Sequence, residues 1–231
     1  MDLSVIIPCK KEAQNISSCV QRVNLACPGA EILVVDSGLD DTKEIVGQLK
    51  ISIPHLRYIL STPDRGKGDA ISQGISQATR PYIAQIDADL QFYPEELPQL
   101  LSPILSNQAD MVLGSRFLKK SVRKPGSSPF FRSFGNFIIS LLCSLLFFKK
   151  ITDALAGMKV WRREVTESFT LTSYTYSYEV ELFAKAILKG WRVRDVPVTF
   201  EPRREGVSTV SVFKAGLNII KDIFRFRFLK K

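Results

Sequence analysis

Histidine is almost absent from this chain, and cysteine is sparse. His55 is the only histidine among 231 residues, and Cys9, Cys19, Cys27 and Cys143 form no CxxC pair. A structural zinc site needs about four closely spaced sulfur or imidazole ligands, so this composition excludes one. We expect free thiols in a reducing compartment.

The sequence also lacks internal repeats and linker-like stretches rich in proline, glycine or serine. Residues 1–10, MDLSVIIPCK, carry no basic segment before a short apolar run, so we expect a strand here and no secretory leader. With 45% hydrophobic and 24% charged residues, the chain has the composition of a globular protein with a sizeable core.

Acidic residues are missing from one long stretch. Residues 111–152 contain no Asp or Glu but eight basic residues, and residues 211–231 hold six basic residues against Asp222. Both blocks adjoin apolar segments, which favours an anionic membrane surface as a partner. A nucleic-acid groove would need aromatic side chains interleaved with the cations. We therefore expect no nucleic-acid partner.

No segment of the chain predicts a membrane span. The apolar residues 134–148 fall short of the ~20 residues that a transmembrane helix needs, so they predict a buried or interfacial helix. Residues 211–231 predict a basic amphipathic helix with one apolar face formed by Phe213, Leu217, Ile220 and Phe224. We expect a cytoplasmic protein that associates with the membrane peripherally.

Short apolar strands alternate with helices through the first half of the chain. We expect strands at 3–8, 31–36, 56–60, 82–86 and 111–115, and later at 159–161 and 191–200. The alternation predicts an α/β fold with right-handed crossovers and a mainly parallel sheet covered on both faces. Ligands bind beyond the carboxyl ends of such strands, where Asp36, Asp87 and Asp89 fall.

The sharpest motif, residues 87–91 with the sequence DADLQ, directly follows an apolar strand. Carboxylate and amide oxygens suit a hard cation such as Mg²⁺ or Mn²⁺, which would neutralise charge on a nucleoside diphosphate leaving group. The alternative is a solvated acidic turn, because Asp is a common turn residue. The position after a buried strand favours the metal.

Two further segments end near the same sheet edge. Asp36 can accept hydrogen bonds from a base or ribose. For Asp40 and Asp41 two interpretations stay open: ligand binding, or capping of the next helix. Residues 65–68, RGKG, precede a helix whose amides and cations could contact a phosphate, and a generic basic turn is the alternative. The P-loop pattern is absent.

Arginines and carboxylates of the second half are candidates for the acceptor site. Guanidinium groups bind phosphate bidentately, and the candidates are Arg116, Arg132, Arg203 and Arg204. Three carboxylates deserve notice: Asp153, Glu179 and Glu181. Because Glu179 and Glu181 lie two apart on an expected helix, at most one of them reaches a site.

These motifs occur in one order over nearly the whole chain: VIIPCKKEAQNI, VVDSGLDDT, RGKGDAI, YIAQIDADLQFYPEEL, GSRF, DALAGMKVWRREV, YEVELFAKAILKGWRVRDVPVTF and PRREGVSTVS. In this respect the chain resembles the family 2 glycosyltransferases with a GT-A fold, and within them the dolichyl- or polyprenyl-phosphate sugar transferases. It departs from their pattern at Lys10-Lys11, in the acidic turn after Asp36, and at Ala156 and Met158, positions that concern base and sugar contacts.

The resemblance implies roles for particular residues. The metal ligands would be Asp87, Asp89 and Gln91. The nucleotide would contact Pro8, Glu12 and Asp36, with Lys67 and Asp87 near the donor phosphates. The acceptor phosphate would be held by Arg116, Arg132 and Arg203. The residues expected to act in catalysis are Asp89, Arg116 and Asp153, the last of them near the sugar.

The resemblance also predicts a GT-A domain over residues 1–210, with a nucleotide-sugar half (1–110) and an acceptor half (111–210), before the helix at 211–231. The expected function is metal-dependent inverting transfer from a nucleoside-diphosphate sugar to a polyprenyl (dolichyl) phosphate. One alternative is a glycan or protein hydroxyl acceptor, which would need Asp153 or Glu179 as a base. The other is a non-catalytic nucleotide-sugar-binding membrane adaptor.

Overall fold

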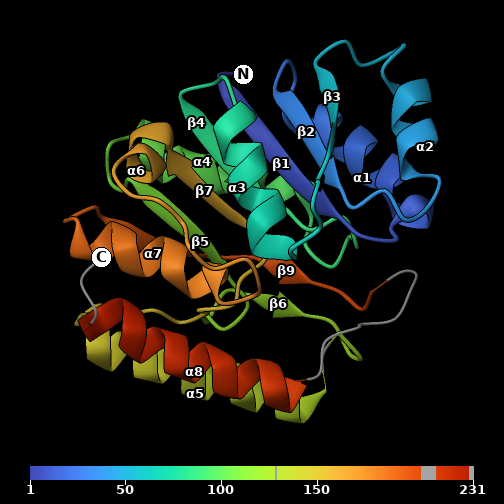
Figure 1. Cartoon of the computed structure of the whole chain (residues 1–231). Coiled ribbons are helices and arrows are strands. Elements are labelled where there is room, and N and C mark those ends of the chain that lie inside the picture. Colours follow the sequence, from blue (N-terminus) through green and yellow to red (C-terminus); the bar gives the residue numbers. More distant parts are fainter. Residues whose placement is uncertain (128, 204–211, 229–231) are drawn as a thin grey trace.

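A seven-stranded sheet in the order β3-β2-β1-β4-β7-β5-β8 forms the centre of the computed structural model, which describes residues 1–127, 129–203 and 212–228 (Figure 1). Its strands are β1 Leu3–Cys9, β2 Glu31–Asp36, β3 Leu56–Leu60, β4 Tyr82–Gln85, β5 Met111–Ser115, β7 Lys159–Arg162 and β8 Val193–Pro197. A separate parallel pair consists of β6 Val122–Arg123 and β9 Thr199–Phe200.

The sheet is mainly parallel, as the sequence predicts. β1 pairs in parallel with β2 and β4, β2 with β3, and β5 with β8, whereas β7 runs antiparallel to both of its neighbours. The register places Cys9 opposite Asp36 at the carboxyl ends of β1 and β2. The segments that follow β1, β2 and β4 therefore meet at one edge of the sheet.

Helices cover both faces of the sheet because its strands are apolar on both sides. In β1, Val5 and Ile7 join one buried cluster and Ile6 joins the other. The first cluster includes side chains of α1 Ala13–Ala26, α2 Thr42–Leu49 and α4 Leu97–Leu105. The second includes α3 Lys67–Gln77, α5 Phe130–Phe147, α7 Tyr178–Leu188 and α8 Val212–Phe228. Two short helices, η1 Pro94–Glu96 and α6 Arg163–Glu167, complete the description.

The α5 and α8 helices lie side by side beneath the rest of the molecule (Figure 1). Helix α5 begins after Pro129, earlier than the apolar run alone predicts, and ends at Phe147. Phe148, the residue after it, has a left-handed backbone conformation. No helix among the described residues is both long enough and apolar enough to cross a bilayer.

Helix α8 carries apolar residues on two sides. Among the side chains of α8 that the structure describes, the buried ones are Ile219, Ile223 and Phe226. On the predicted apolar face, Leu217 and Phe224 are 55% and 44% exposed and Ile220 is partly buried. The Phe213 side chain lies outside the described part. One apolar side of α8 therefore packs on the protein, and the predicted apolar face is largely exposed.

Candidate active site

The chain turns sharply just after β4, where the two predicted metal-binding carboxylates stand. Leu90 has a φ of 59°, a left-handed value that is uncommon for leucine and marks a locally constrained backbone. The backbone N–H of Gln91 donates to Asp89 Oδ1 at 3.1 Å. This turn brings both carboxylates to the same place beyond the sheet edge.

The Asp87 carboxylate lies between the Lys67 ammonium and the backbone of Gly157. Lys67 Nζ lies 2.7 Å from Asp87 Oδ1. On the other side is Gly157, where an added Cβ would overlap the Asp87 carboxylate. The Asp87 side chain remains 25% exposed. Any side chain at residue 157 would therefore displace Asp87.

Asp89 is more enclosed and lies next to Asp87. Burial first, and then the negative charge of Asp87, raise the pKa of Asp89 to about 6. Arg203 Nε is 3.5 Å from Asp89 Oδ2, and the same guanidinium pairs with Glu12. Glu12 also accepts a hydrogen bond from Asn15 Nδ2 at 2.7 Å. Arg203 thus joins the segment after β9 to Glu12, just before α1, and to Asp89, just after β4.

The donor set at this turn fits a hard divalent cation. Its accessible ligands are carboxylate oxygens, which Mg²⁺ and Mn²⁺ prefer. Among the described residues no group of three or more His, Cys, Asp or Glu is arranged to hold a metal ion. Asp87 and Asp89 would therefore share a cation with oxygens from water and a diphosphate.

Gln91 anchors this turn to two later segments of the chain. Its Nε2 donates to the backbone oxygens of Ser127 at 3.2 Å and Glu201 at 3.0 Å. Both hydrogen bonds use the amide nitrogen, and a metal would need the amide oxygen. Its role as a ligand stays a prediction.

Behind Lys67 lies a buried network that the sequence interpretation missed. Lys67 Nζ is 3.0 Å from Glu179 Oε1, which also accepts the Tyr178 hydroxyl at 2.6 Å. Glu179 Oε2 pairs with Lys159, which is fully buried. Gln85 Nε2 donates to the Tyr178 hydroxyl at 2.7 Å. Lysine and glutamine at buried positions of otherwise apolar strands were the signal available in the sequence.

Electrostatics in this network fix the charge of Glu179. Burial alone would raise the pKa of Glu179, but the charges of Lys159 and Lys67 outweigh it and hold that pKa well below its usual range. Glu181, two residues on, accepts the backbone N–H groups of Thr172 and Ser173 instead. As expected, no more than one of the two glutamates reaches the site.

The RGKG segment serves mainly to place Lys67. The Gly68 N–H donates to Tyr174 O at 2.8 Å, and a Cβ at residue 68 would collide with the backbone there. Arg65 pairs with Asp69 at 2.8 Å and lies 4.3 Å from the centroid of the Tyr174 ring. Close packing therefore explains the glycine, and Lys67 is the cation of this segment that faces the carboxylates.

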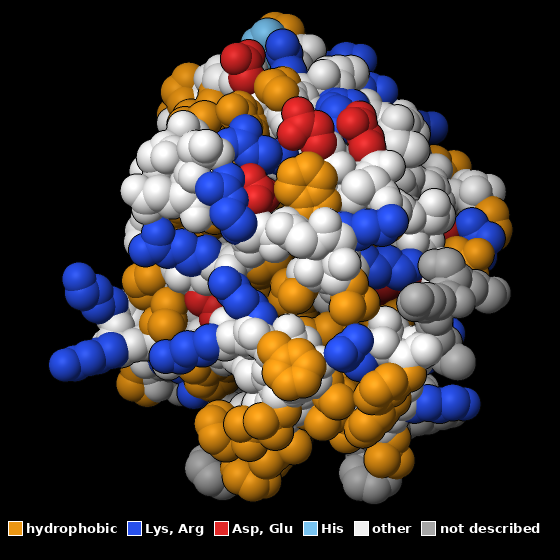
Figure 2. All heavy atoms as spheres, turned by 90° about the vertical axis from the view of Figure 1, so that its left-hand side faces the viewer, with side chains coloured by type: hydrophobic (Ala, Val, Ile, Leu, Met, Phe, Trp, Pro, Cys, Tyr) orange, Lys and Arg blue, Asp and Glu red, His pale blue; other side chains and the backbone are white. Residues whose placement is uncertain are grey.

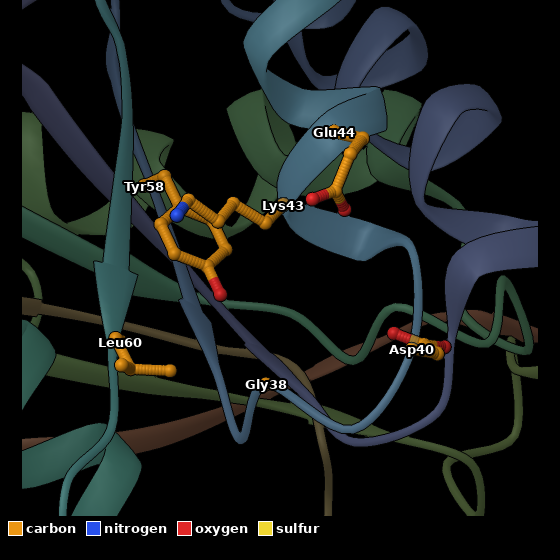
Figure 3. A pocket seen from close by; sticks show the side chains of 6 residues that line it. All are labelled: Gly38, Asp40, Lys43, Glu44, Tyr58 and Leu60. Carbon is orange, nitrogen blue, oxygen red and sulfur yellow. The ribbon is translucent and has the colours of Figure 1, made fainter.

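A cavity of about 530 Å³ opens beside the carboxyl end of β2 (Figure 3). Strand β3 and the beginning of α2 form its walls, and the lining residues are Gly38, Asp40, Lys43, Glu44, Tyr58 and Leu60. The Tyr58 hydroxyl donates to Asp36 Oδ2 at 2.9 Å, and Asp36 itself is fully buried. Pro8 precedes Cys9 at the end of the neighbouring strand.

Asp40 serves as a cap as well as lining this cavity. Its carboxylate accepts the N–H of Ala13 at 2.9 Å and that of Thr42 at 3.2 Å, the first residues of α1 and α2. A side-chain oxygen that satisfies such free amides stabilises the helix. The structure thus favours the capping interpretation for Asp40.

Arg116 and Asp153 form a buried ion pair with each other. The Nε and Nη2 atoms of Arg116 lie 2.7 and 2.8 Å from the two carboxylate oxygens, and Asn136 Nδ2 donates to Asp153 Oδ1 at 2.7 Å. Asp153 is fully buried, and the Arg116 guanidinium lies 4.9 Å from the centroid of the Phe200 ring. Asp153 has no exposed oxygen with which to take a proton.

Arg132 differs from the other predicted phosphate-binding arginines. It lies in the first turn of α5 and forms no ion pair with any described residue, and its Nε is buried without a hydrogen-bond partner there. Arg123 is nearby and donates to Ser133 at 2.7 Å. Arg204 lies outside the described residues.

The chain is similar in sequence to known proteins over most of its length. The model of glycosyl transferase family 2 matches residues 4–169. A polyprenol monophosphomannose synthase of Mycolicibacterium smegmatis is 33% identical over 96% of this chain and 84% of its own length. A dolichol-phosphate mannosyltransferase of Pyrococcus furiosus is 32% identical over 97% of this chain.

Some relatives are considerably longer than this chain. It spans 63% of the Pyrococcus furiosus enzyme. It spans 51% of a low-salt glycan biosynthesis hexosyltransferase of Haloferax volcanii, to which it is 28% identical.

Solved structures share the fold. A glucosyl-3-phosphoglycerate synthase of Mycobacterium tuberculosis, in complex with Mn²⁺, UDP and glucosyl-3-phosphoglycerate, superposes with a TM-score of 0.74 at 20% identity, over 99% of this chain and 81% of that one. The predicted α/β architecture, the family resemblance and the class of enzyme are thereby confirmed. The chain belongs to glycosyl transferase family 2 and is a glycosyltransferase.

Proposed function

We propose that this protein is a metal-dependent inverting glycosyltransferase that moves a sugar from a nucleoside-diphosphate sugar to a polyprenyl phosphate at a membrane surface. The observation that carries the proposal is the meeting of Asp87 and Asp89 with Lys67 and Arg203 beyond the carboxyl end of β4. Relatives named as polyprenol and dolichol phosphate mannosyltransferases support the choice of acceptor.

On the donor side, the cavity beside β2 takes the base and ribose. Asp36 and Tyr58 border it with a carboxylate and a hydroxyl. Lys67 and Arg203 hold the diphosphate near Asp87 and Asp89. When bound there, Mg²⁺ or Mn²⁺ supplies charge neutralisation for the departing diphosphate.

The acceptor chemistry follows from which carboxylates are available as a base. A hydroxyl acceptor has to lose a proton, but Asp153 is enclosed by Arg116 and Asn136, and Glu179 is held ionised with a low pKa between two lysines. A phosphate monoester is already ionised at neutral pH. This arrangement favours a phosphate over a hydroxyl acceptor.

In the transfer itself, an acceptor phosphate oxygen forms a bond to the anomeric carbon as the bond from that carbon to the diphosphate breaks. Attack from the opposite face inverts the configuration, and the nucleoside diphosphate leaves with the bonding electrons. Arg132, whose guanidinium forms no ion pair within the described residues, is the arginine best placed to bind the incoming phosphate. The chain's contribution is to hold two anions in line.

The surface formed by α5 and α8 suits a membrane. Large apolar side chains are exposed along α5 and its end: Phe131, Phe134, Phe137, Ile138, Leu141, Leu145 and Phe148. The adjacent ones on α8 are Leu217, Phe224 and Phe228. We call these ten residues the apolar face, and Figure 2 shows apolar side chains gathered at the base of the molecule with Lys and Arg beside them. Apolar insertion combined with cations supports binding to anionic lipid.

The proposal is tested by following labelled sugar from GDP-mannose and UDP-glucose in the presence of polyprenyl phosphate vesicles. We expect label to enter the organic phase with Mg²⁺ or Mn²⁺ and to stay in water with EDTA. Transfer of the label to a glycan hydroxyl would contradict the proposal that the acceptor is a polyprenyl phosphate. A protein that neither transfers nor hydrolyses any donor would support the adaptor alternative.

A further inference from the structure

Lys67 stands between the metal site and the buried network behind it. Its Nζ is 2.7 Å from Asp87 Oδ1 and 3.0 Å from Glu179 Oε1, and its side chain is 17% exposed. Glu179 has a second cation of its own, because Lys159 pairs with its other oxygen. Since Glu179 is already neutralised, the charge of Lys67 is available to Asp87.

The backbone that carries Lys67 is held in place. Gly68 packs against residues 173–175 so closely that any side chain there would collide, and its N–H donates to Tyr174 O at 2.8 Å. Asp69, two residues after Lys67, is itself buried. The ammonium can therefore change partner only by moving along its own flexible stem.

The charges around the metal site are nearly balanced before any ligand arrives. Its carboxylates are Glu12, Asp87, Asp89 and Glu179, and its cations are Lys67, Lys159 and Arg203. A divalent cation on its own would give this enclosed cluster excess positive charge, and it would lie within a few ångströms of an ammonium. Like charges at that separation repel strongly where water is partly excluded. A diphosphate that arrives together with the cation removes the excess.

We propose that Lys67 is a positioning residue that acts as the counter-ion of Asp87 in the nucleotide-free protein, so that a divalent cation binds tightly only together with a diphosphate. This inference rests on the proposed function, because it takes Asp87 as a metal ligand. As the diphosphate binds, the ammonium passes from Asp87 to a phosphate oxygen and frees the carboxylate for the cation. By linkage, the cation tightens nucleotide binding by the same factor.

Mn²⁺ binding to the full chain, measured from the electron paramagnetic resonance signal of free Mn²⁺, tests the coupling with and without saturating GDP or UDP. In the unmodified protein we expect one of the nucleotides to tighten Mn²⁺ binding about fiftyfold. In Lys67→Met, Mn²⁺ alone should bind at least about tenfold tighter, and the nucleotide should add less than about fivefold.

Three further variants separate the role of this charge from general effects. Lys67→Gln should behave like Lys67→Met and carries the same test should methionine disturb packing. Lys67→Arg retains the cation and should retain the coupling. Arg65→Met removes a neighbouring cation that is paired with Asp69, and it should leave Mn²⁺ affinity unchanged. Thermal unfolding checks that each variant is folded.

The outcomes distinguish this inference from the proposed function. If the unmodified protein binds Mn²⁺ with GDP or UDP but neither neutral variant binds free Mn²⁺ more tightly, Lys67 is not the counter-ion and the function stands. If the unmodified protein binds neither nucleotide in the presence of Mn²⁺, the proposed donor chemistry is itself wrong.

Discussion

Charged residues are paired with one another at the proposed donor site, whereas several lysines near the apolar face are left to solvent. At the donor site, Lys67 contacts Asp87 and Glu179, and Arg203 contacts Glu12 and Asp89. Beside the apolar face, the exposed Lys149, Lys150 and Lys221 form no ion pair within the described part of the chain.

This difference in pairing corresponds to two kinds of recognition. Paired, half-buried charges hold their positions in advance, which is what a reaction between two anions requires. Solvated lysines around apolar side chains have no fixed partner and can follow a surface whose headgroups move. Substitutions at the proposed donor site should therefore change turnover, whereas substitutions at the apolar face should change membrane affinity.

The largest expected effect is at Asp89. Asp89→Ala removes one of two carboxylates from the cation and should lower transfer about a thousandfold, with vesicle binding unchanged. Turnover and vesicle co-sedimentation are measured on the same preparation. Asp2→Ala is the matched control, because Asp2 is exposed before the amino end of β1. Near-normal turnover in folded Asp89→Ala would remove the basis of the donor-site assignment.

The next largest effect is expected for a substitution at Gly157, which packs against the Asp87 carboxylate. In Gly157→Ala the new Cβ would overlap Asp87, so the carboxylate has to shift. A displacement of this size near the reacting groups should cost about a hundredfold in turnover. Weaker Mn²⁺ and nucleotide binding should accompany it.

Gly47→Ala is the control for that substitution. Gly47 lies in α2, and a Cβ added there meets no atom within 4 Å. Alanine should raise the stability of that helix by roughly 0.5–1 kcal/mol and leave turnover intact. Equal turnover in the two variants would show that the position of Asp87 is not critical.

The donor site also shows how far sequence patterns reach. Alternating strands and helices predicted the mainly parallel sheet, and strand ends predicted that Asp36, Asp87 and Asp89 would lie at the same edge of it. These inferences succeed because strand direction and topology fix which ends share an edge.

Partnerships between distant charges follow no such rule. Lys67 and Glu179 are 112 residues apart in sequence, and the spacing of apolar residues in either segment does not indicate that the two side chains touch. Arg116 and Asp153 were both expected to act on substrate, yet the structure pairs them with each other.

On the membrane side, the apolar residues should matter more than any single cation. Leu145 is 64% exposed on α5, and Leu145→Glu places a charge where the face would meet lipid. Vesicle affinity should fall at least about tenfold, because the burial of a leucine is lost and a carboxylate is added. Turnover with a short-chain, water-soluble phosphate acceptor should be unchanged.

Leu25→Glu is the matched control for that change. Leu25 is 78% exposed on α1, which lies on the other face of the sheet from α5 (Figure 1). The Leu25→Glu variant should bind vesicles as the unmodified protein does. Equal losses in both variants would show that exposed leucines contribute nonspecifically, and no loss in either would separate the apolar face from lipid binding.

The smallest expected effect belongs to a single lysine beside the apolar face. Lys221→Gln should weaken binding to vesicles rich in anionic lipid about fivefold, since each nearby cation contributes about 1 kcal/mol, and should not change binding to neutral vesicles. Lys50→Gln, at the far end of α2, should have no effect on either. Added salt should diminish the Lys221 effect, because solvent-exposed charges are screened within about 10 Å at 0.1 M. Were the loss instead equal on neutral and anionic vesicles, Lys221 would contribute through packing, and the contrast between fixed and solvated charge would not hold at this face.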